Sequence, residues 1–422
     1  MWLPRAGAAY QINSRTVLRG GYGIYYARLI NSTVFSGLTS TGALGSQTSV
    51  TFLPSQTTAP NFPFVFPAAS APPGKNIVYF DRNFQNPQIR QADLTLEQDL
   101  GWGTMLSFSY LGSFGRQLPS FVDTNVGAPT KTVTYQVVNG GPLTSPTYTT
   151  TLFNTARPNA LFGSMTDVFS GVISNYQAMA FQLNHRMSHN VQFNANYTWS
   201  HALDNGVNGQ TFSTTNSLLD PTNLNKEYGN SIYNIPNRFV LNAVITSPWK
   251  SGGWAKQLVE GWQLSPIYQI QTGNPYTAFV SGSAPGGALG GINGSGGTNR
   301  IDIGRNTFRQ PATWITDLRV SKSFSVTERY KLEILTDFFN LANKQNVTGV
   351  NTTAYLAQST GTIPLAGGGV ATCTAASPCL GFNLASPTSA TPFAPLFGST
   401  TNSNSNFIYN PRQIQFGARF HF

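Results

Sequence analysis

Apolar and polar residues alternate one by one in many segments of this chain, and this alternation constrains its fold more than any other feature. In VQFNANYTWS (191–200), every second residue is apolar and every residue between is polar. Successive side chains of a β-strand point to opposite faces, so the pattern indicates strands with one apolar and one polar face. Helical periodicity is nearly absent. The sequence predicts eleven strands, at 5–12, 16–26, 88–99, 104–114, 175–186, 191–200, 237–247, 259–272, 312–324, 329–340 and 411–422.

The connections between these strands alternate between short and long. The short ones are 13–15, 100–103, 187–190, 248–258 and 325–328, and the long ones are 27–87, 115–174, 201–236, 273–311 and 341–410. Long loops without structure of their own argue against an ordinary compact domain. A transmembrane β-barrel has tight turns on its periplasmic side, long loops outside, and strands of about 9–11 residues. We therefore predict an all-β, antiparallel transmembrane β-barrel with short periplasmic turns and long extracellular loops.

The tryptophans support this orientation, because amphipathic rings gather at the two headgroup levels of a membrane. All seven are expected at strand ends or in turns. The outer rim would hold Trp2, Trp199 and Trp314, and the inner rim Trp102, Trp249, Trp254 and Trp262.

The charged residues of the predicted strands share the polar face, as they must if the apolar face contacts lipid. Two residues break the pattern: Arg90, which is near a strand end and could snorkel, and Lys322, which is less easily explained. The residues expected to face the lumen are Arg19, Asp93, Glu97, Arg186, Arg238, Asp317, Arg319, Lys331, Glu333, Asp337 and Arg419.

The composition excludes several other classes. Charged residues make up 9% of the chain, and its 25 Lys and Arg residues are scattered without a basic run, so nucleic-acid binding is not expected. No run of eighteen apolar residues predicts a transmembrane helix, and the first residues do not form a signal peptide. A soluble β-sandwich also has alternating strands, but it predicts regular spacing and no preference of Trp for strand ends.

No pattern in the sequence predicts catalysis, a cofactor or a metal site. His185 and His189 span a predicted turn, where solvated histidines are expected instead of a zinc pair on a helix. The glycine-rich segment 286–297 lacks the lysine of a phosphate-binding loop and is expected to be a mobile loop tip. Cys373 and Cys379 are close enough in sequence for a small disulfide, with two free thiols as the alternative.

Two further features concern the lumen and the outer surface. Acids and bases in DLRV (317–320) and KLEIL (331–335) are expected to form cross-strand pairs along the lumen wall. The connection 341–410 carries only Lys344 as a charge. Such a surface could stack on sugars or peptides, or simply resist proteolysis, and the second interpretation is the simpler one.

Several segments resemble one known family. They look like the C-terminal half of the barrel of Oar-like TonB-dependent outer-membrane receptors, and the similarity runs through the strands and lapses in the long loops. The segments are VLRGGYGIYYA (17–27), LSFSYLGSFGRQLP (106–119), FNANYTWSHALDNG (193–206), GWQLSPIYQIQTGNPYT (261–277), DLRVSKSFSVTERYKLEILTDFFNLANKQN (317–346) and PRQIQFGARFHF (411–422).

The resemblance implies a barrel of 22 strands, preceded by a plug domain, a TonB-contacting segment and an N-terminal carboxypeptidase-regulatory-like domain. Only half of those strands are expected here, and the plug, the TonB-contacting segment and the N-terminal domain are expected to be absent. Eleven antiparallel strands cannot close on themselves without one parallel pair, so we expect a fragment of a longer barrel. For the intact parent, the implied function is ligand capture and TonB-dependent uptake across the outer membrane of a Gram-negative bacterium, with an unknown extracellular ligand. This chain alone is not expected to perform energised transport. A non-transporting adhesin or structural barrel is the alternative.

The last strand, QIQFGARFHF (413–422), ends on an aromatic residue. The resemblance implies that this strand is a recognition signal for the barrel-assembly machinery. The residues of that signal would be Ile414, Phe416, Phe420 and Phe422, with Ala418 on the same lipid face.

Overall fold

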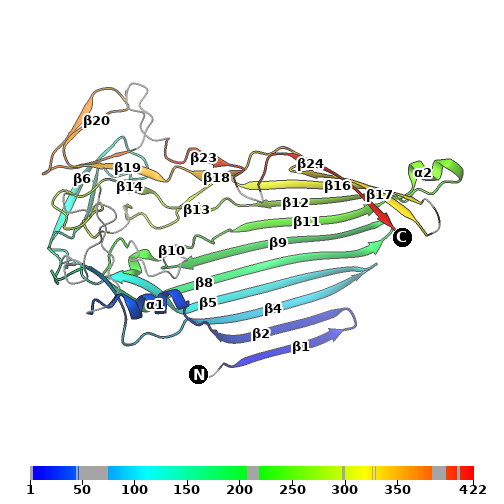
Figure 1. Ribbon diagram of the computed structural model, residues 1–422, viewed down its shortest axis with the longest axis horizontal. Helices are drawn as coiled ribbons and strands as arrows, with labels where there is room; N and C mark the ends of the chain where they lie inside the picture. The colour runs from blue at the N-terminus through cyan, green and yellow to red at the C-terminus, as the bar shows by residue number, and fades with distance from the viewer. Residues whose placement is uncertain are drawn as a thin grey trace, which may run out of the picture.

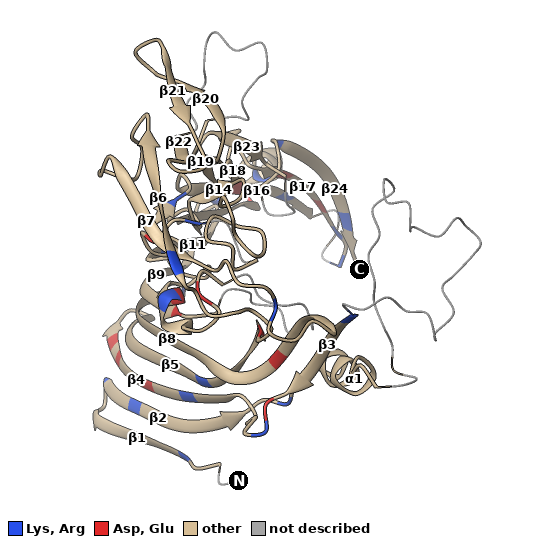
Figure 2. Cartoon of the chain, turned by 90° about the vertical axis from the view of Figure 1, so that its left-hand side faces the viewer, with Lys and Arg blue, Asp and Glu red and all other residues tan. Residues whose placement is uncertain are grey.

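The computed structural model describes residues 3–43, 46, 75–206, 218–296, 300–325, 327, 329–382, 396–405 and 409–422. One large antiparallel sheet dominates it, and its strands pair in sequence order (Figure 1). They are β1 (Arg5–Asn13), β2 (Thr16–Tyr26), β4 (Gln88–Gly101), β5 (Thr104–Asp123), β8 (Phe162–Ser188), β9 (Val191–Asp204), β11 (Asn237–Thr246), β12 (Trp262–Gln271), β16 (Thr313–Ser325), β17 (Lys331–Phe339) and β24 (Gln413–His421). These are the eleven strands that the sequence predicts, and Figure 2 shows the sheet curving from β1 round to β24 as a trough-like wall.

Two strands are much longer than predicted. β5 continues to Asp123 and β8 begins at Phe162, where the sequence predicts a loop. The extensions pair with each other, and β3 (Lys75–Phe80) joins β8 in parallel. Phe121, Val168 and Val78 form a small buried cluster at this junction, with Phe80 and Phe84 packed against it. The predicted ends were wrong because the strands gain this apolar packing beyond the membrane-height segment.

Asp167 lies in the extension of β8, where its Oδ1 is buried without a hydrogen-bond partner among the described residues. Burial and the neighbouring Asp81 raise the pKa of this carboxyl from 3.8 to about 6. The pKa of this carboxyl is higher in the folded chain than in the unfolded chain, so its ionisation destabilises the fold. Stability is therefore lost as the pH rises from about 4 to about 6. We predict that Asp167→Asn makes the junction more resistant to limited proteolysis at pH 7 and hardly changes it at pH 4. An equal pH dependence in both proteins would contradict this.

The register gives the sheet two faces, since directly paired residues share a face. Thr95 on β4 pairs with Arg19 and with Ser109, and the polar row continues through Ala180, Thr198 and Arg238. The neighbouring row on the other face contains Leu96, Phe108, Phe181 and Tyr197. Along these rows one face is therefore mostly polar and the other apolar.

The described parts of the long connections fold together at one end of the wall, at the left of Figure 1. Their main sheet has the order β14-β19-β22-β6-β7, with strands β6 (Lys131–Val138), β7 (Thr147–Leu152), β14 (Phe279–Ser281), β19 (Thr353–Gln358) and β22 (Cys379–Phe382). We call this sheet and the described residues 218–236 and 284–311 the loop module. Its core includes Tyr135, Tyr355 and Ile292, all nearly inaccessible to solvent. The expectation of a mobile tip at 286–297 was therefore wrong for its described part, because Ile292 anchors it in this core.

The remaining elements are short. The strands are β10 (Gly229–Asn230), β13 (Pro275–Tyr276), β15 (Phe308–Arg309), β18 (Val347–Val350), β20 (Gly361–Pro364), β21 (Val370–Cys373) and β23 (Thr400–Ser403). The helical segments are α1 (Asn31–Thr39), α2 (Lys256–Val259), η2 (Leu224–Glu227) and η3 (Gly253–Ala255). Among the described residues, no helix has the length and apolar character needed to cross a membrane.

Candidate functional site: the polar wall and the loop module

Ion pairs and amide contacts connect neighbouring strands along the polar face. Arg319 Nε and Nη2 contact the two carboxylate oxygens of Asp337 at 2.6 and 2.9 Å. Arg19 contacts Glu97 at 3.0 Å. The cross-strand pairs expected between DLRV and KLEIL are wrong in detail, because the register sets Arg319 opposite Asp337 and not opposite residues 331–335. A bidentate Arg–carboxylate ion pair fixes the geometry of both side chains, so this part of the wall is preorganised.

The register places nearly all the residues expected in the lumen on this one polar face. Glu333 contacts Arg419 at 3.9 Å and His421 at 3.5 Å, and Arg238 donates a hydrogen bond to Gln269 at 3.5 Å. Arg186 lies beside a register shift between His185 and Ser188. The others on the face are Arg19, Asp93, Glu97, Asp317, Arg319, Lys331 and Asp337.

Arg90 and Lys322 lie on the apolar face, as the alternation predicts. Arg90 is near the loop end of β4 and donates from Nε to Gln88 Oε1 at 2.9 Å, so its charge reaches toward polar groups at the rim. Lys322 is only 6% exposed and lies beside the ring of Trp262, its direct partner on β12. Neither charge lies in the middle of the apolar face.

The tryptophans lie largely where the sequence places them. Trp102, Trp249 and Trp254 occupy turns, while Trp262 and Trp314 lie at the starts of β12 and β16. Trp199 lies inside β9 and not at its end, because β9 continues to Asp204 and pairs there with β10. Trp2 falls outside the described residues.

Buried tyrosines join the long connections within the loop module. Tyr135 Oη donates to the carbonyl of Ile292 at 2.7 Å, and Tyr355 Oη donates to Gly140 at 2.8 Å. Tyr148 Oη accepts a hydrogen bond from the amide of Asp302 at 3.1 Å. Burial raises the pKa of all three phenols, that of Tyr355 to about 12. These neutral hydroxyls tie the described parts of connections 115–174, 273–311 and 341–410 into one body.

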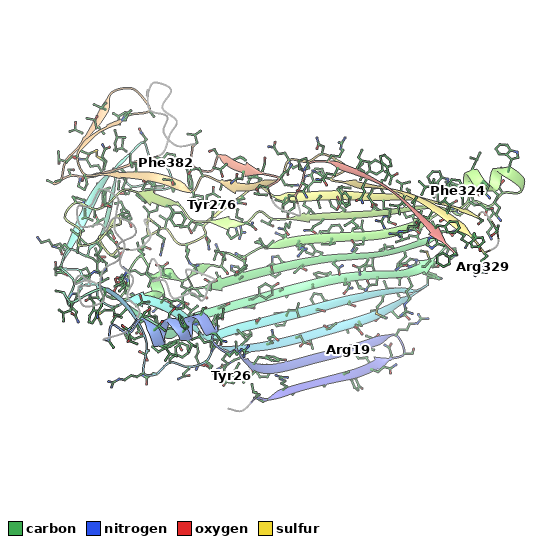
Figure 3. All side chains as sticks on the ribbon, viewed as in Figure 1. Arg19, Tyr26, Tyr276, Phe324, Arg329 and Phe382 are labelled. Atoms are coloured by element: carbon green, nitrogen blue, oxygen red, sulfur yellow. A yellow bond between two sulfur atoms is a disulfide. The ribbon has the colours of Figure 1, made fainter. Side chains whose placement is uncertain are left out.

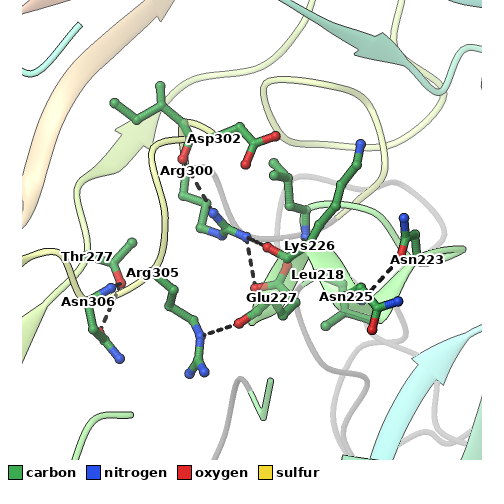
Figure 4. A network of polar contacts seen from close by, with 12 residues as sticks. Leu218, Asn223, Asn225, Lys226, Glu227, Thr277, Arg300, Asp302, Arg305 and Asn306 are labelled. Carbon is green, nitrogen blue, oxygen red and sulfur yellow. Dashed lines mark hydrogen bonds and ion pairs between the residues drawn. The ribbon is translucent and has the colours of Figure 1, made fainter. Parts of the chain in front are cut away.

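A buried ionic network joins connection 201–236 to the same body (Figure 4). Arg300 donates to Glu227 Oε2 at 3.0 Å, and these side chains are only 3% and 1% exposed. Glu227 Oε1 also accepts from the amide of Leu219 at 2.7 Å. Arg305 donates to the carbonyl of Glu227 at 3.0 Å and forms an ion pair with Asp204 at the end of β9. The network therefore links the loop module to the wall.

Cys373 and Cys379 form a disulfide, with 5.5 Å between their Cα atoms, and both are buried with Val138 and Ile363. It lies at the edge of the loop module, where β21 ends and β22 begins. A bond across so short a loop constrains the local chain, which is consistent with an ordered outer surface.

The two histidines do not form a site. His185 lies in β8, where its Nδ1 contacts Thr104 Oγ1 at 2.7 Å and its ring stacks on Phe193 at 5.4 Å. The sequence predicts a solvated turn residue here, and this was wrong for His185, because β8 continues through it. His189 lies in the turn, with a φ of 49°. In the described part of the chain, no group of three His, Cys, Asp or Glu side chains is arranged to hold a metal.

Sequence reasoning missed the loop module and its ionic network. Alternation in KTVTYQVV (131–138) was the available signal, since Val133 and Tyr135 are buried between exposed polar residues. A second signal was the pair of arginines in 300–305, inside a connection otherwise rich in glycine. Nothing local in the sequence indicates that Glu227, far away along the chain, is the partner of Arg300.

On the apolar face, β24 contributes the residues expected to form an assembly signal. Ile414, Phe416 and Phe420 pair directly with Phe338, Thr336 and Leu332 of β17. Phe422 follows the strand and is 87% exposed. The strand is thus ordered as the last one of the wall.

Several solved structures are similar to this chain, each at low identity. The outer membrane transporter YddB of Escherichia coli matches with 10% identity and a TM-score of 0.49, over 89% of this chain and 39% of that one. FpvA of Pseudomonas aeruginosa matches with 10% identity and a TM-score of 0.46, over 100% and 33%. The FrpB iron transporter of Neisseria meningitidis matches with 9% identity and a TM-score of 0.41, over 81% and 35%. This chain therefore spans well under half the length of each, and these values assign it no ligand.

Comparison with curated proteins finds no match. A family model described as an outer membrane beta barrel domain matches residues 1–301 and 293–415, which is nearly the whole chain. The match agrees with the two-faced antiparallel wall, its tight turns and its long connections. The chain belongs to the outer membrane beta barrel domain family, and its place is the outer membrane.

Proposed function

We propose that this chain forms part of the barrel of an uptake receptor, in which the loop module captures a ligand and the polar wall lines its path. The observation that carries the proposal is the continuous polar face, which bears the ion pairs Arg19–Glu97 and Arg319–Asp337. A face of charges and amides must meet water or a polar plug, and large outer-membrane barrels hold such a lumen.

The energy for passage would come from the TonB system, acting on the whole protein. This part of the proposal rests on the resemblance to Oar-like receptors, as does an interaction of β24 with the barrel-assembly machinery. We propose binding and passage without chemical conversion of the ligand. Its chemical class is left open, because the loops that would select it have no counterpart in the resemblance.

The test compares accumulation of labelled peptides and oligosaccharides by cells with and without the gene, before and after a proton uncoupler. We expect accumulation that requires both the gene and the proton gradient. Arg238→Gln would test whether the polar wall takes part in uptake. Arg238 has only Gln269 as a side-chain partner among the described residues, so its replacement should leave assembly intact. Accumulation that is unaffected by the uncoupler would contradict energised uptake.

A non-transporting adhesin is the second candidate. The ordered loop module favours it, together with connection 341–410, which carries only Lys344 as a charge, since an ordered surface of this kind is also suited to holding a partner at the cell surface. In that case the same labelled probes would bind to the cell surface but would not enter, and an uncoupler would leave the bound amount unchanged.

A further inference from the structure

Lys322 is a buried charge on the face of the wall that meets lipid. Its direct partners on the neighbouring strands are Trp262 and Ile334, so the three side chains form one row. The ammonium group lies 5.3 Å from the centre of the Trp262 ring and 5.2 Å from that of Phe324. Phe324 is at the turn end of the wall, opposite the loop module (Figure 3). This is the level at which one leaflet has its headgroups.

The turn between β11 and β12 folds back beside Lys322 and makes a groove of about 260 Å³. Gly261, with a φ of 73°, permits this path, since a Cβ there would lie 2.5 Å from the carbonyl oxygen of Ser323. Trp262 Nε1 donates to the carbonyl of Leu258 at 2.8 Å, and Gln257 Nε2 donates to that of Ser325 at 3.1 Å. The turn is thus fixed to the wall before any ligand arrives.

The groove has an apolar part and a charged part. Val320, Ile334, Phe324 and Leu258 supply the apolar surface, and Lys322 the charge. Lys322 Nζ donates to the carbonyl of Glu260, and among the described residues no carboxylate forms an ion pair with it. An ammonium group has three donors, so the carbonyl leaves some of them available. A buried charge without a counter-ion is costly, and an anion in the groove would offset that cost.

The turn between β11 and β12 exposes side chains of the kinds that bind at the headgroup level of a membrane. Trp249 and Trp254 are 66% and 79% exposed, and Lys250 and Lys256 are exposed beside them. Exposed tryptophans with lysines are typical of segments that lie at a membrane surface, and basic side chains there attract anionic lipids.

We propose that this groove binds an anionic phospholipid of the leaflet at the turn side of the barrel. The lipid phosphate would accept a hydrogen bond from Lys322, and an acyl chain would lie along Val320, Ile334 and Leu258. The groove opens on the membrane side of the wall, so binding depends on neither the loop module nor uptake, and the two proposals can fail separately.

The test is native mass spectrometry of the detergent-extracted protein, titrated with phosphatidylglycerol or with phosphatidylethanolamine. We expect the protein to retain phosphatidylglycerol at least about fivefold better. Lys322→Gln should abolish this preference, and Lys322→Arg should keep part of it. Lys331→Gln is the matched control, because Lys331 is at the same end of the wall on the polar face, and it should keep the preference.

Leu258→Asn is a second variant that does not threaten folding, because Leu258 is 59% exposed. It should weaken retention of both lipids by removing the contact with the acyl chain. The proposal is overturned if Lys322→Gln folds with heat-modifiable mobility and keeps the preference, or if Leu258→Asn binds both lipids unchanged. Equal occupancy by inorganic phosphate would identify a free anion, and a doubled protein mass would identify a second copy, and either result would overturn the lipid assignment.

Discussion

Replacing Glu227 with Ala should lower the free energy of unfolding of the loop module by about 3–5 kcal/mol, because it leaves the guanidinium of Arg300 buried without its partner. Both side chains are almost inaccessible to solvent, and Glu227 Oε1 also holds the amide of Leu219. The loss would therefore release residues 218–227 from the described part of 284–311. Urea unfolding, followed by limited proteolysis within the loop module, measures it.

Lys226→Ala is the matched control one residue away. Its ion pair with Asp220 spans 3.3 Å, but the lysine side chain is 36% exposed, so solvent screens the interaction. Its removal should cost about 1 kcal/mol or less. Equal effects of the two substitutions would show that the buried pair does not hold the module together.

Replacing Leu241 with Arg should destabilise the barrel by about 2–4 kcal/mol, because it puts a charge on the lipid face near the middle of β11. Leu241 pairs directly with Ala195 and Tyr268, both on the apolar face. The ring of Tyr268 also contacts the rings of Phe239 and Trp314. An arginine at position 241 would therefore have few polar groups within reach. Reversible urea unfolding in lipid vesicles provides the measurement.

The adjacent residue is the control for this substitution. Val240 pairs with Asn196 and Gln269 on the polar face, so Val240→Arg should change the unfolding free energy by about 1 kcal/mol or less. If Val240→Arg were the more destabilising of the two, the assignment of the faces would be reversed.

The wall could be predicted from the sequence because its strands obey a purely local rule. Most of the eleven alternate apolar and polar residues, and this alternation, together with the pairing of strands that are neighbours in the sequence, sets register and face. The position of the charges on the polar face followed for the same reason. Lys322 was the exception, because its charge lies on the apolar face. Its surroundings include residues of the turn at 253–261, and the alternation of residues in the strands does not predict the path of that turn.

The loop module could not be predicted because its contacts join residues far apart in the chain. Tyr135 forms a hydrogen bond with Ile292, and Glu227 forms an ion pair with Arg300. Nothing in a single sequence indicates that these pairs of connections are in contact. Strand pairs such as β22 with β6 are parallel and non-local as well. Composition suggested loops, whereas burial of a few aromatic residues produced a folded body.

We expect this wall to cross the membrane with its apolar face toward lipid. Nitroxide labels placed singly at 192–197 of β9 test it most directly, with the native cystine left oxidised. We expect oxygen to reach Phe193, Ala195 and Tyr197 best, and a water-soluble nickel chelate to reach Gln192, Asn194 and Asn196 best. Uniform accessibility along β9, or the opposite alternation, would contradict it.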